Sequence, residues 1–599
     1  MNYALNNGSK SASGQTNGSK EKQKGTLQSA FKKLAPFLAG EKRNVTIAFI
    51  AILLNSASNL IGPVIIGYTV DMYIRNGDFD GVLTFSALLL GVYAVGLVAS
   101  YVQTITMGGV GRRVLFNMRN AIFNKLQELP VAFFHQNKTG DLISRINNDT
   151  DKLNQFFAQA LMQFVGNFFL VIGAGIFLLS LHLQLGGTAI VPAIGVFILT
   201  QLLSSWVKRK NMASLQSTGG MSAEIQESLE NFKVIVAFNR LDYFRKKFNE
   251  ANNVNYKASV SAGLANNIFI PIYGLAANVA QLLVLTYGIY LISIGDFTIG
   301  LLIGFLLYVN SFYNPLRQLG ALWASLQMAL AALDRISEVL ALHSDMPVIA
   351  DHSKKTKSGD DLVMEFHDVS FGYPNGKMVL QHINLNLKKG HTYAFVGPTG
   401  GGKTTTASLM ARLYDPTEGT VLLDGKDIRS YESAERSKKI GFILQEPFLF
   451  TGTVRDNILY GNEEYLKYTN EELRETLEKN NLSQLLARFD QGLETPIATT
   501  GDAISLGQKQ LIAFIRAVLR KPEILILDEA TANIDTVTEQ LLEEILQKLP
   551  AETTKVIIAH RLNTINNADQ ICFVNGGEVT LAGSMDHALE MLLHGKRKS

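Results

Sequence analysis

Six apolar segments, each close to the length that crosses a bilayer, constrain this chain more than any other feature. They run from about 44 to 70, 81 to 107, 157 to 181, 186 to 206, 264 to 292 and 299 to 319. A helix needs roughly 20 apolar residues to span the hydrocarbon core, and one such stretch would equally suit a buried core helix. Six of them in one chain favour a membrane-spanning helical bundle.

The links between these segments alternate in length and charge. The links after the first, third and fifth segments are short, and Arg75 is the only basic residue among them. The other two links, about 108–156 and 207–263, are long and show helical periodicity. Among their basic residues are Arg112, Arg113, Arg119, Lys125, Lys208, Arg209, Lys210, Arg240, Arg245, Lys246 and Lys247. Because basic residues gather on the cytoplasmic side, we expect both long links and both termini to be cytoplasmic.

Composition separates the chain into two parts. Of the 599 residues 47% are hydrophobic and 18% charged, with the apolar excess in the first half and the charge in the second. This asymmetry predicts a membrane part followed by a soluble part, and a net charge of +3 is too small to indicate a nucleic-acid partner. The single cysteine, Cys572, lies in an apolar strand-like run, so we predict a buried thiol and no internal disulfide.

The domain boundaries follow from the same pattern. Residues 1–30 are rich in Ser, Gly, Asn and Lys without an apolar stretch, which predicts a disordered polar tail and neither a signal nor a transit peptide. We predict a six-helix transmembrane domain over 31–342, a polar linker over 343–361 and an α/β domain over 362–599.

A phosphate-binding loop is the clearest chemical signal. The run V-G-P-T-G-G-G-K-T-T from Val396 to Thr405 fits G-x-x-x-x-G-K-S/T between an expected strand and an expected helix. Such a loop wraps phosphates in backbone N–H groups, places a lysine on the terminal phosphates and offers a hydroxyl to Mg²⁺. The predicted ATP-binding residues are Gly397, Pro398, Thr399, Gly400, Gly401, Gly402, Lys403, Thr404 and Thr405.

Polar residues that end or follow other strands complete a catalytic hypothesis. The run I-L-I-L-D-E ends in Asp528, a predicted Mg²⁺ ligand with Thr404, and Glu529, the predicted general base for the attacking water. Gln445 in F-I-L-Q-E-P follows a strand and is predicted to contact both metal and water. His560 in V-I-I-A-H-R-L is predicted to contact the γ-phosphate, and Tyr373 in F-G-Y-P to stack on adenine. Taken singly, each would more often be a structural residue.

Together with A-I-S-L-G-Q-K-Q-L at 503–511 and A-N-I-D at 532–535, these motifs stand in the order of an ABC ATPase. The chain therefore resembles an ABC transporter from about residue 30 to its end. The resemblance implies an α-helical membrane bundle followed by an α/β P-loop ATPase, with ATP and Mg²⁺ as cofactors. It also implies a signature that acts on the opposite subunit, Ser505, Leu506, Gly507 and Gln508, and a D-loop ending at Asp535.

The membrane half carries the same resemblance. The stretches 129–151, 230–240 and 314–336 look like the cytoplasmic loops and sixth helix of a type I ABC exporter. The resemblance implies two short coupling helices, expected near 133–140 and near 215–224. Within the spans, polar residues either face a cargo pathway or, the commoner case, bond between helices. They are Asn55, Asn59, Gln163, Asn167, Asn266, Asn267, Asn278, Gln281 and Asn310. For Phe312, Tyr313 and Trp323 the alternatives are cargo stacking and ordinary packing.

The chain departs from its family in the element that acts on the partner subunit. The family signature is usually L-S-G-G-Q, whereas Leu506 stands here at the first glycine, and Thr499 stands near the place of a glutamate common upstream. A leucine adds bulk and disfavours any positive φ at that position. The resemblance therefore implies a heterodimer with a related half-transporter. One of its two ATP sites would be competent and the other degenerate. A homodimer that tolerates leucine is the alternative.

The resulting prediction is an ATP-driven exporter of an amphiphilic or apolar substrate, multidrug type first, in a bacterial cell membrane in contact with its lipids. A homodimeric lipid or peptide exporter and a regulatory ABC protein without transport are the alternatives. An importer is disfavoured by the fusion of membrane and ATPase parts, and a peptide-processing exporter by the short tail before Lys32.

Overall fold

In the computed structural model, the described residues are 3, 5, 27–350, 361–374, 376–498, 504–528, 536–558, 565, 567–583, 587 and 590. The chain divides into two compact units. A helical unit comprises Asn6–Gln127 and Gly140–Ala341, and an α/β unit comprises Met1–Leu5, Glu128–Thr139 and Leu342–Ser599. The short segment Glu128–Thr139, between long helices of the first unit, thus belongs to the second.

The helical unit supplies six helical spans that are long and apolar enough to cross a membrane, in the part of the chain that the structure describes. They are Lys32–Ile74, Phe79–Gln127, Thr139–Leu181, Leu183–Glu230, Leu241–Ser293 and Ile299–Leu340. The helices of this part of the chain are α1 (Leu27–Leu38), η1 (Ala39–Glu41), α2 (Lys42–Thr69), η2 (Val70–Ile74), α3 (Phe79–Gln127), α5 (Thr139–Ser144), η3 (Arg145–Asp149), α6 (Thr150–Gln155), η4 (Phe156–Ala160), α7 (Leu161–Leu181), α8 (Leu183–Glu230), α9 (Phe232–Ala237), α10 (Leu241–Asn267), α11 (Phe269–Ser293) and α12 (Ile299–Leu340). The six predicted apolar segments are confirmed.

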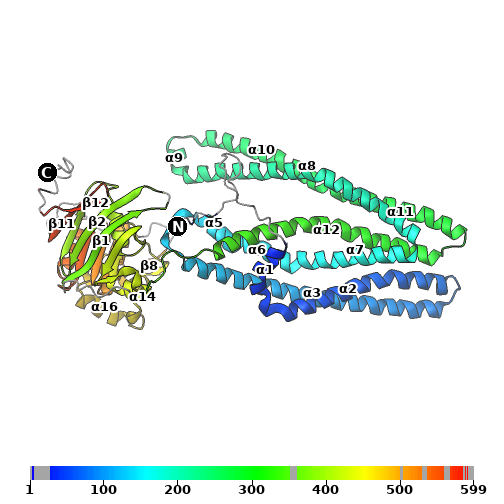
Figure 1. The fold of residues 1–599 in the computed structure, drawn as a ribbon, viewed down its shortest axis with the longest axis horizontal. Helices are drawn as coiled ribbons and strands as arrows, with labels where there is room; N and C mark the ends of the chain where they lie inside the picture. Colours follow the sequence, from blue (N-terminus) through cyan, green and yellow to red (C-terminus); the bar gives the residue numbers. More distant parts are fainter. Residues whose placement is uncertain are drawn as a thin grey trace. The chain divides into compact units, whose positions relative to one another are not determined.

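The longest helices run well beyond the predicted spans, as their periodicity indicated. Helix α3 has 49 residues and α8 has 48. At 1.5 Å per residue each measures about 70 Å, more than twice the thickness of the hydrocarbon core. Within this unit α2 packs along α3 and α12, α7 along α12, and α8 along α10 and α11 (Figure 1).

Small residues let α2 and α12 approach closely. A Cβ placed on Gly300 would overlap the carbonyl oxygen of Gly67, so neither helix tolerates a larger residue there. The Asp71 carboxylate accepts hydrogen bonds from the Gly300 N–H at 2.8 Å and from the Thr298 hydroxyl. It thereby caps the start of α12.

The α/β unit is built on two principal sheets. The larger has the strand order β12-β11-β3-β10-β9-β6, and its neighbours are parallel except at β12; the smaller is antiparallel with the order β2-β1-β4-β5. The strands are β1 (Leu362–Gly372), β2 (Met378–Lys388), β3 (Thr392–Val396), β4 (Glu418–Leu423), β5 (Lys426–Asp427), β6 (Ile440–Ile443), β7 (Gly452–Thr453), β8 (Pro496–Ile497), β9 (Ile524–Asp528), β10 (Thr554–Ile558), β11 (Gln570–Asn575) and β12 (Glu578–Leu581). This confirms the predicted α/β fold.

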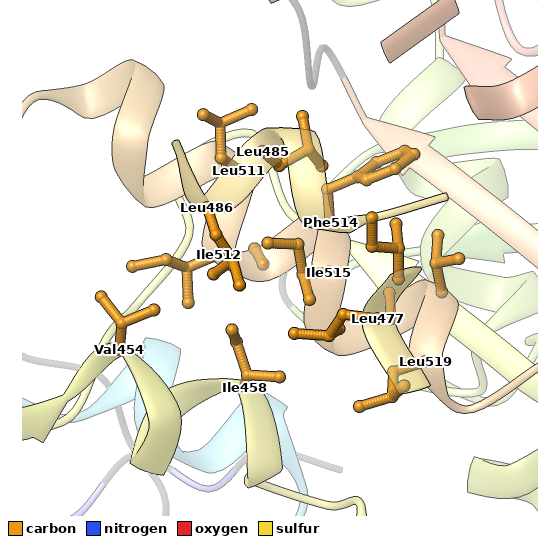
Figure 2. Packing of buried hydrophobic residues seen from close by; sticks show 14 of the residues in the cluster. Val454, Ile458, Leu477, Leu485, Leu486, Leu511, Ile512, Phe514, Ile515 and Leu519 are labelled. Atoms are coloured by element: carbon orange, nitrogen blue, oxygen red, sulfur yellow. The ribbon is translucent and has the colours of Figure 1, made fainter. Parts of the chain in front are cut away.

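The helices of this unit contribute to an extended apolar core. They are α4 (Val131–Gln136), α13 (Lys403–Met410), η5 (Ile428–Ser430), α14 (Ser433–Lys439), α15 (Val454–Leu459), η6 (Glu463–Tyr465), α16 (Asn470–Lys479), α17 (Ser483–Leu486), η7 (Gly492–Glu494), α18 (Leu506–Leu519) and α19 (Thr536–Gln547). Figure 2 shows Ile512 and Ile515 of α18 pointing into a cluster with Val454, Ile458 and Leu477. This packing fixes α18, and with it the position of the signature residues.

Two expectations differ from the structure. The stretch 215–224 lies inside the continuous helix α8, so the predicted second coupling helix is wrong there. The chain bends only after Glu230, where Asn231 leaves helical geometry (φ −102°, ψ 17°) and the short helix α9 begins. Within the predicted disordered tail, Tyr3 and Leu5 are buried and α1 begins at Leu27.

Candidate nucleotide-binding site

The phosphate loop joins β3 to α13 in the conformation that its glycines allow. Gly397, Gly400 and Gly402 have φ of +143°, +80° and +115°, which L-residues rarely adopt. A Cβ on Gly397 would also overlap the carbonyl oxygen of Val574 in β11. The loop therefore depends on bare backbone for its shape, and it exposes main-chain groups ahead of the N-terminus of α13, where an anion is favoured.

Lys403 opens α13 and is folded back over the loop. Its ammonium donates hydrogen bonds to the carbonyl oxygens of Gly397 at 2.8 Å and Pro398 at 3.1 Å, and the residue is buried. The next residue, Thr404, is exposed, and its hydroxyl donates to Asp528 Oδ1 at 3.3 Å. A hydroxyl and a carboxylate at this spacing suit shared ligation of Mg²⁺ with nucleotide phosphates.

The sheet register brings the acidic strand to the loop. Ile558 of β10 pairs with Phe395 of β3 on one side and with Asp528 of β9 on the other, all in parallel. Because parallel strands end at the same edge, Asp528 and the phosphate loop open on one side of the sheet. Strand β6 is parallel to β9 with Ile443 beside Leu527, so the exposed Gln445 follows at the same edge.

An aromatic group lies beside the start of α13, just after the loop. The Tyr373 hydroxyl lies 3.2 Å from Thr405 Oγ1, and its ring meets Tyr414 edge to face at 5.3 Å. Tyr414 shares a 2.9 Å hydrogen bond with Nδ1 of His135 in α4, and burial raises the pKa of Tyr414 to about 12. No sequence motif marks Tyr414 or His135; they stand 279 residues apart, and only the fold brings them together.

The signature forms an ordinary capped helix start. Ser505 precedes α18, its hydroxyl accepts from the Gln508 N–H at 3.2 Å, and Gln508 Oε1 accepts from the Ser505 N–H at 3.0 Å, a reciprocal capping box. Leu506 is the first helical residue, without positive φ, and its side chain is 38% exposed. The leucine thus causes no backbone strain. Its side chain instead adds volume, beside Gly507, to the surface at the N-terminus of α18.

Several predicted residues fall outside the described part of the chain. Glu529, His560, Asp535 and Thr499 are among them. The strands before Glu529 and His560 are nevertheless described as far as Asp528 in β9 and Ile558 in β10, and these two residues pair side by side.

Most of the polar residues in the spans bond to other residues of the helical unit. Asn167 donates to Gln318 Oε1 at 3.0 Å, Gln281 to Asn310 Oδ1 at 2.9 Å, and Asn266 and Asn211 donate to each other. Phe312 and Tyr313 are buried by packing, and the side chain of Trp323 is outside the described residues.

A cavity of about 540 Å³ opens between α2 and α3. Its uncharged lining includes Asn55, Ser58, Asn59, Tyr93, Ser100 and Thr104.

Two family models match the chain in this order. Residues 45–316 match the ABC transporter transmembrane region, and residues 380–532 match the ABC transporter ATPase model, described as "ABC transporter". An uncharacterised ABC transporter ATP-binding protein of Bacillus subtilis (strain 168) is 32% identical, over 94% of this chain and 92% of its own. The chain belongs to the ABC transporter family.

Other relatives of this ABC transporter carry functional names. A fatty acid ABC transporter ATP-binding/permease protein of Mycobacterium bovis is 30% identical over 85% of this chain and 79% of its own. A multidrug resistance ABC transporter ATP-binding and permease protein of Lactococcus lactis subsp. cremoris is 30% identical over 83% of each chain. With a membrane region fused to an ATPase region, this chain is an exporter half-transporter, a multi-pass membrane protein that couples ATP hydrolysis to transport.

Proposed function

We propose that this half-transporter works in a heterodimer with one competent and one degenerate ATP site and exports an amphiphilic or apolar compound. The observation that carries the proposal is Leu506, exposed at the first position of α18 where the family signature has glycine. Since a signature acts on ATP held by the opposite subunit, the bulk of Leu506 weakens the partner's site. The phosphate loop that this chain keeps for its own nucleotide is intact.

In the competent site, the chain's own residues bind and hydrolyse ATP. Backbone N–H groups of Gly400–Lys403 hold the phosphates, Lys403 exchanges its carbonyl partners for phosphate oxygens, and Tyr373 stacks on the adenine. Mg²⁺ bound by Thr404, Asp528 and Gln445 would neutralise charge that develops on the phosphates. Glu529 accepts a proton from the attacking water, while His560 and Asp535 contact the γ-phosphate and the facing subunit.

The ATP sites shared between the two subunits couple ATP binding to movement of the membrane domain. ATP enclosed between the two ATPase units stabilises the closed dimer, because it binds that state more tightly than the open one. The coupling helices, α4 and α9 in this proposal, then turn the cargo pathway from inward to outward, and hydrolysis resets it. We place the protein in a bacterial cell membrane with both termini in the cytoplasm, as the basic long links predict.

The cavity between α2 and α3 supports the class of cargo. Its lining offers hydroxyl and amide groups but no charge, beside apolar surface, which suits an amphiphile with a neutral hydrogen-bonding head. The multidrug and fatty acid names of two relatives agree with such cargo. ATP-dependent movement of a fluorescent amphiphilic dye into inverted vesicles would test transport, and hydrolysis without any transport would favour a regulatory role.

The test of the catalytic assignment is Glu529→Gln in the purified complex. We expect ATP binding to persist and turnover to fall at least about 100-fold, because the water loses its base. Glu523→Gln, just before β9, is the matched control: Glu523 accepts a hydrogen bond from Lys439 and should leave turnover near normal. Near-normal hydrolysis in Glu529→Gln would overturn the assignment. Trapping one nucleotide per complex supports the heterodimer, whereas two equivalent trapped nucleotides support the homodimer.

A further inference from the structure

Two residues near the start of the chain, Tyr3 and Leu5, are bound by the α/β unit. Tyr3 is 1% exposed and Leu5 is 7% exposed, although no motif or apolar run surrounds them. Their hydrogen-bond partners lie more than 130 residues away along the chain, in α4 and its end and in the segment that follows α12. Burial of a tyrosine against such distant segments needs a shaped site.

Two consecutive side chains at the end of α4 bind the main chain of this segment. The Tyr3 N–H donates to Gln136 Oε1 at 2.8 Å. The Asn137 side-chain amide donates to the Tyr3 carbonyl at 3.0 Å and accepts from the Leu5 N–H at 3.0 Å. The Asn137 amide thus pairs with the segment as a neighbouring strand would, a mode in which main-chain bonds give affinity and side-chain pockets give specificity.

The specificity pocket receives the Tyr3 side chain. Its hydroxyl lies 2.5 Å from Asp345 Oδ1 and accepts from the Asp345 N–H at 2.8 Å. The His343 carbonyl, at 3.2 Å, is a second acceptor for the same proton. The ring meets the fully buried Phe133 of α4 edge to face, with centroids 6.2 Å apart. Phenylalanine would fill this pocket but lose the hydrogen bonds that the Tyr3 hydroxyl makes with Asp345.

The same helix contacts the nucleotide end of the unit. His135 of α4 bonds to Tyr414, whose ring packs on Tyr373 beside the phosphate loop. Tyr3 therefore touches α4 on one side and Asp345 on the other, and any movement that separates these two segments must release it.

We propose that α4 together with residues 343–345 forms a binding site for a tyrosine-containing peptide, filled in cis by Tyr3 and Leu5. The bound segment is a latch that holds α4, the candidate coupling helix, against the segment entering the ATPase. Covalent attachment gives the latch a high effective concentration, so a weak intrinsic affinity suffices to fill the site. A phosphate on Tyr3 would place about two negative charges beside Asp345 and open the latch.

Peptide binding to a chain that lacks residues 2–10 tests the site. The probe is a fluorescent peptide of residues 1–10, followed by anisotropy with the purified full-length variant in detergent. We expect saturable binding, about tenfold weaker with Tyr3→Phe, and none with Tyr3→Ala or phosphotyrosine. Asp345→Asn in the chain should recover part of the phosphopeptide binding. Equal binding of the Tyr3→Ala peptide would overturn the proposal.

Hydrogen exchange of the intact chain tests the same contacts without added peptide. We expect slow exchange at the amides of Tyr3 and Leu5, lost on Asn137→Ala and retained on Asn148→Ala, an asparagine that bonds to Ser144 in the other unit. If the labelled peptide does not bind at about 1 mM and both amides exchange freely in the intact chain, the latch does not exist. Neither measurement uses ATP or a partner subunit, so both are independent of the proposed heterodimer.

Discussion

This chain contributes two parts to ATP sites, the phosphate loop and the start of α18. The two differ in how strictly backbone geometry limits the residues that can stand there. The phosphate loop, which binds the chain's own nucleotide, has three glycines at positive φ and is pressed against Val574. The start of α18, which by family resemblance acts on the partner's nucleotide, is a standard capped helix with an exposed leucine. The loop is constrained where it packs against Val574, whereas the start of α18 can change its surface without changing its fold.

In the proposed heterodimer, this difference would explain how the signature can degenerate while the phosphate loop is kept. A substitution at a packed loop position such as Gly397 distorts the loop itself, so it weakens binding of the chain's own nucleotide directly. A substitution at Leu506 leaves Ser505 and Gln508 in their capping box and the apolar face of α18 in its core. The chain can therefore lose one function of its ATPase unit and still fold and bind ATP.

The largest effect should come from Gly397→Ala. The added Cβ would overlap the Val574 carbonyl, and alanine disfavours φ of +143°, so the loop must shift. We expect ATP affinity to fall at least about 100-fold, the result of losing several phosphate contacts together. Isothermal titration of the purified chain with ATP measures the change.

Gly400→Ala is its matched control. It also has positive φ, but nothing lies within 4 Å of the position of its Cβ. The cost is then only that of a left-handed alanine, about 1–2 kcal/mol, or roughly tenfold in affinity. Equal losses in the two variants would show that strain alone, and not the contact with β11, constrains the loop.

A smaller, metal-dependent effect is expected for Asp528→Asn. The amide keeps a hydrogen-bond acceptor for Thr404, 3.3 Å away in the wild type, but loses the charge that favours Mg²⁺. We expect roughly tenfold weaker ATP binding in Mg²⁺ and unchanged binding in EDTA. A loss of the same size in EDTA would mean that Asp528 serves the structure of the loop and not the metal.

The part of this site that the sequence can predict is the part with a local signal. The phosphate loop and the strand ending in Asp528 lie together because each motif fixes its own strand end, and parallel pairing aligns those ends. The bend after Glu230 escaped prediction because α8 continues through Gly219 and Gly220, where it packs along α10. Tyr414, His135 and Tyr3 escaped because their contacts join segments remote in sequence, and no local pattern encodes such contacts.

Leu506→Gly should change turnover only slightly, and the size of the change separates the two assemblies. In a heterodimer at most one of two sites gains a complete signature, so the rate should rise no more than about twofold. In a homodimer both sites would improve and no such limit applies. Ser505→Ala is the control for damage to the helix start, since loss of the cap costs about 1 kcal/mol and should lower the melting temperature.

Thiol labelling compares the two halves without changing activity. Cys572 of β11 is fully buried behind the phosphate loop, and burial raises the pKa of its thiol to about 12, against roughly 8.5 in an unfolded chain. At pH 8 the folded chain should therefore react with maleimide only after unfolding. The raised pKa of this thiol also contributes to the stability of the folded chain. That contribution is complete below about pH 8.5 and is lost as pH rises towards 12.

Leu506→Cys, at an exposed site, should label quickly in the same chain, and more slowly when ATP closes the complex. Rapid labelling of Cys572 in the folded protein would contradict its burial, and ATP-independent labelling of Leu506→Cys would contradict a partner-facing signature.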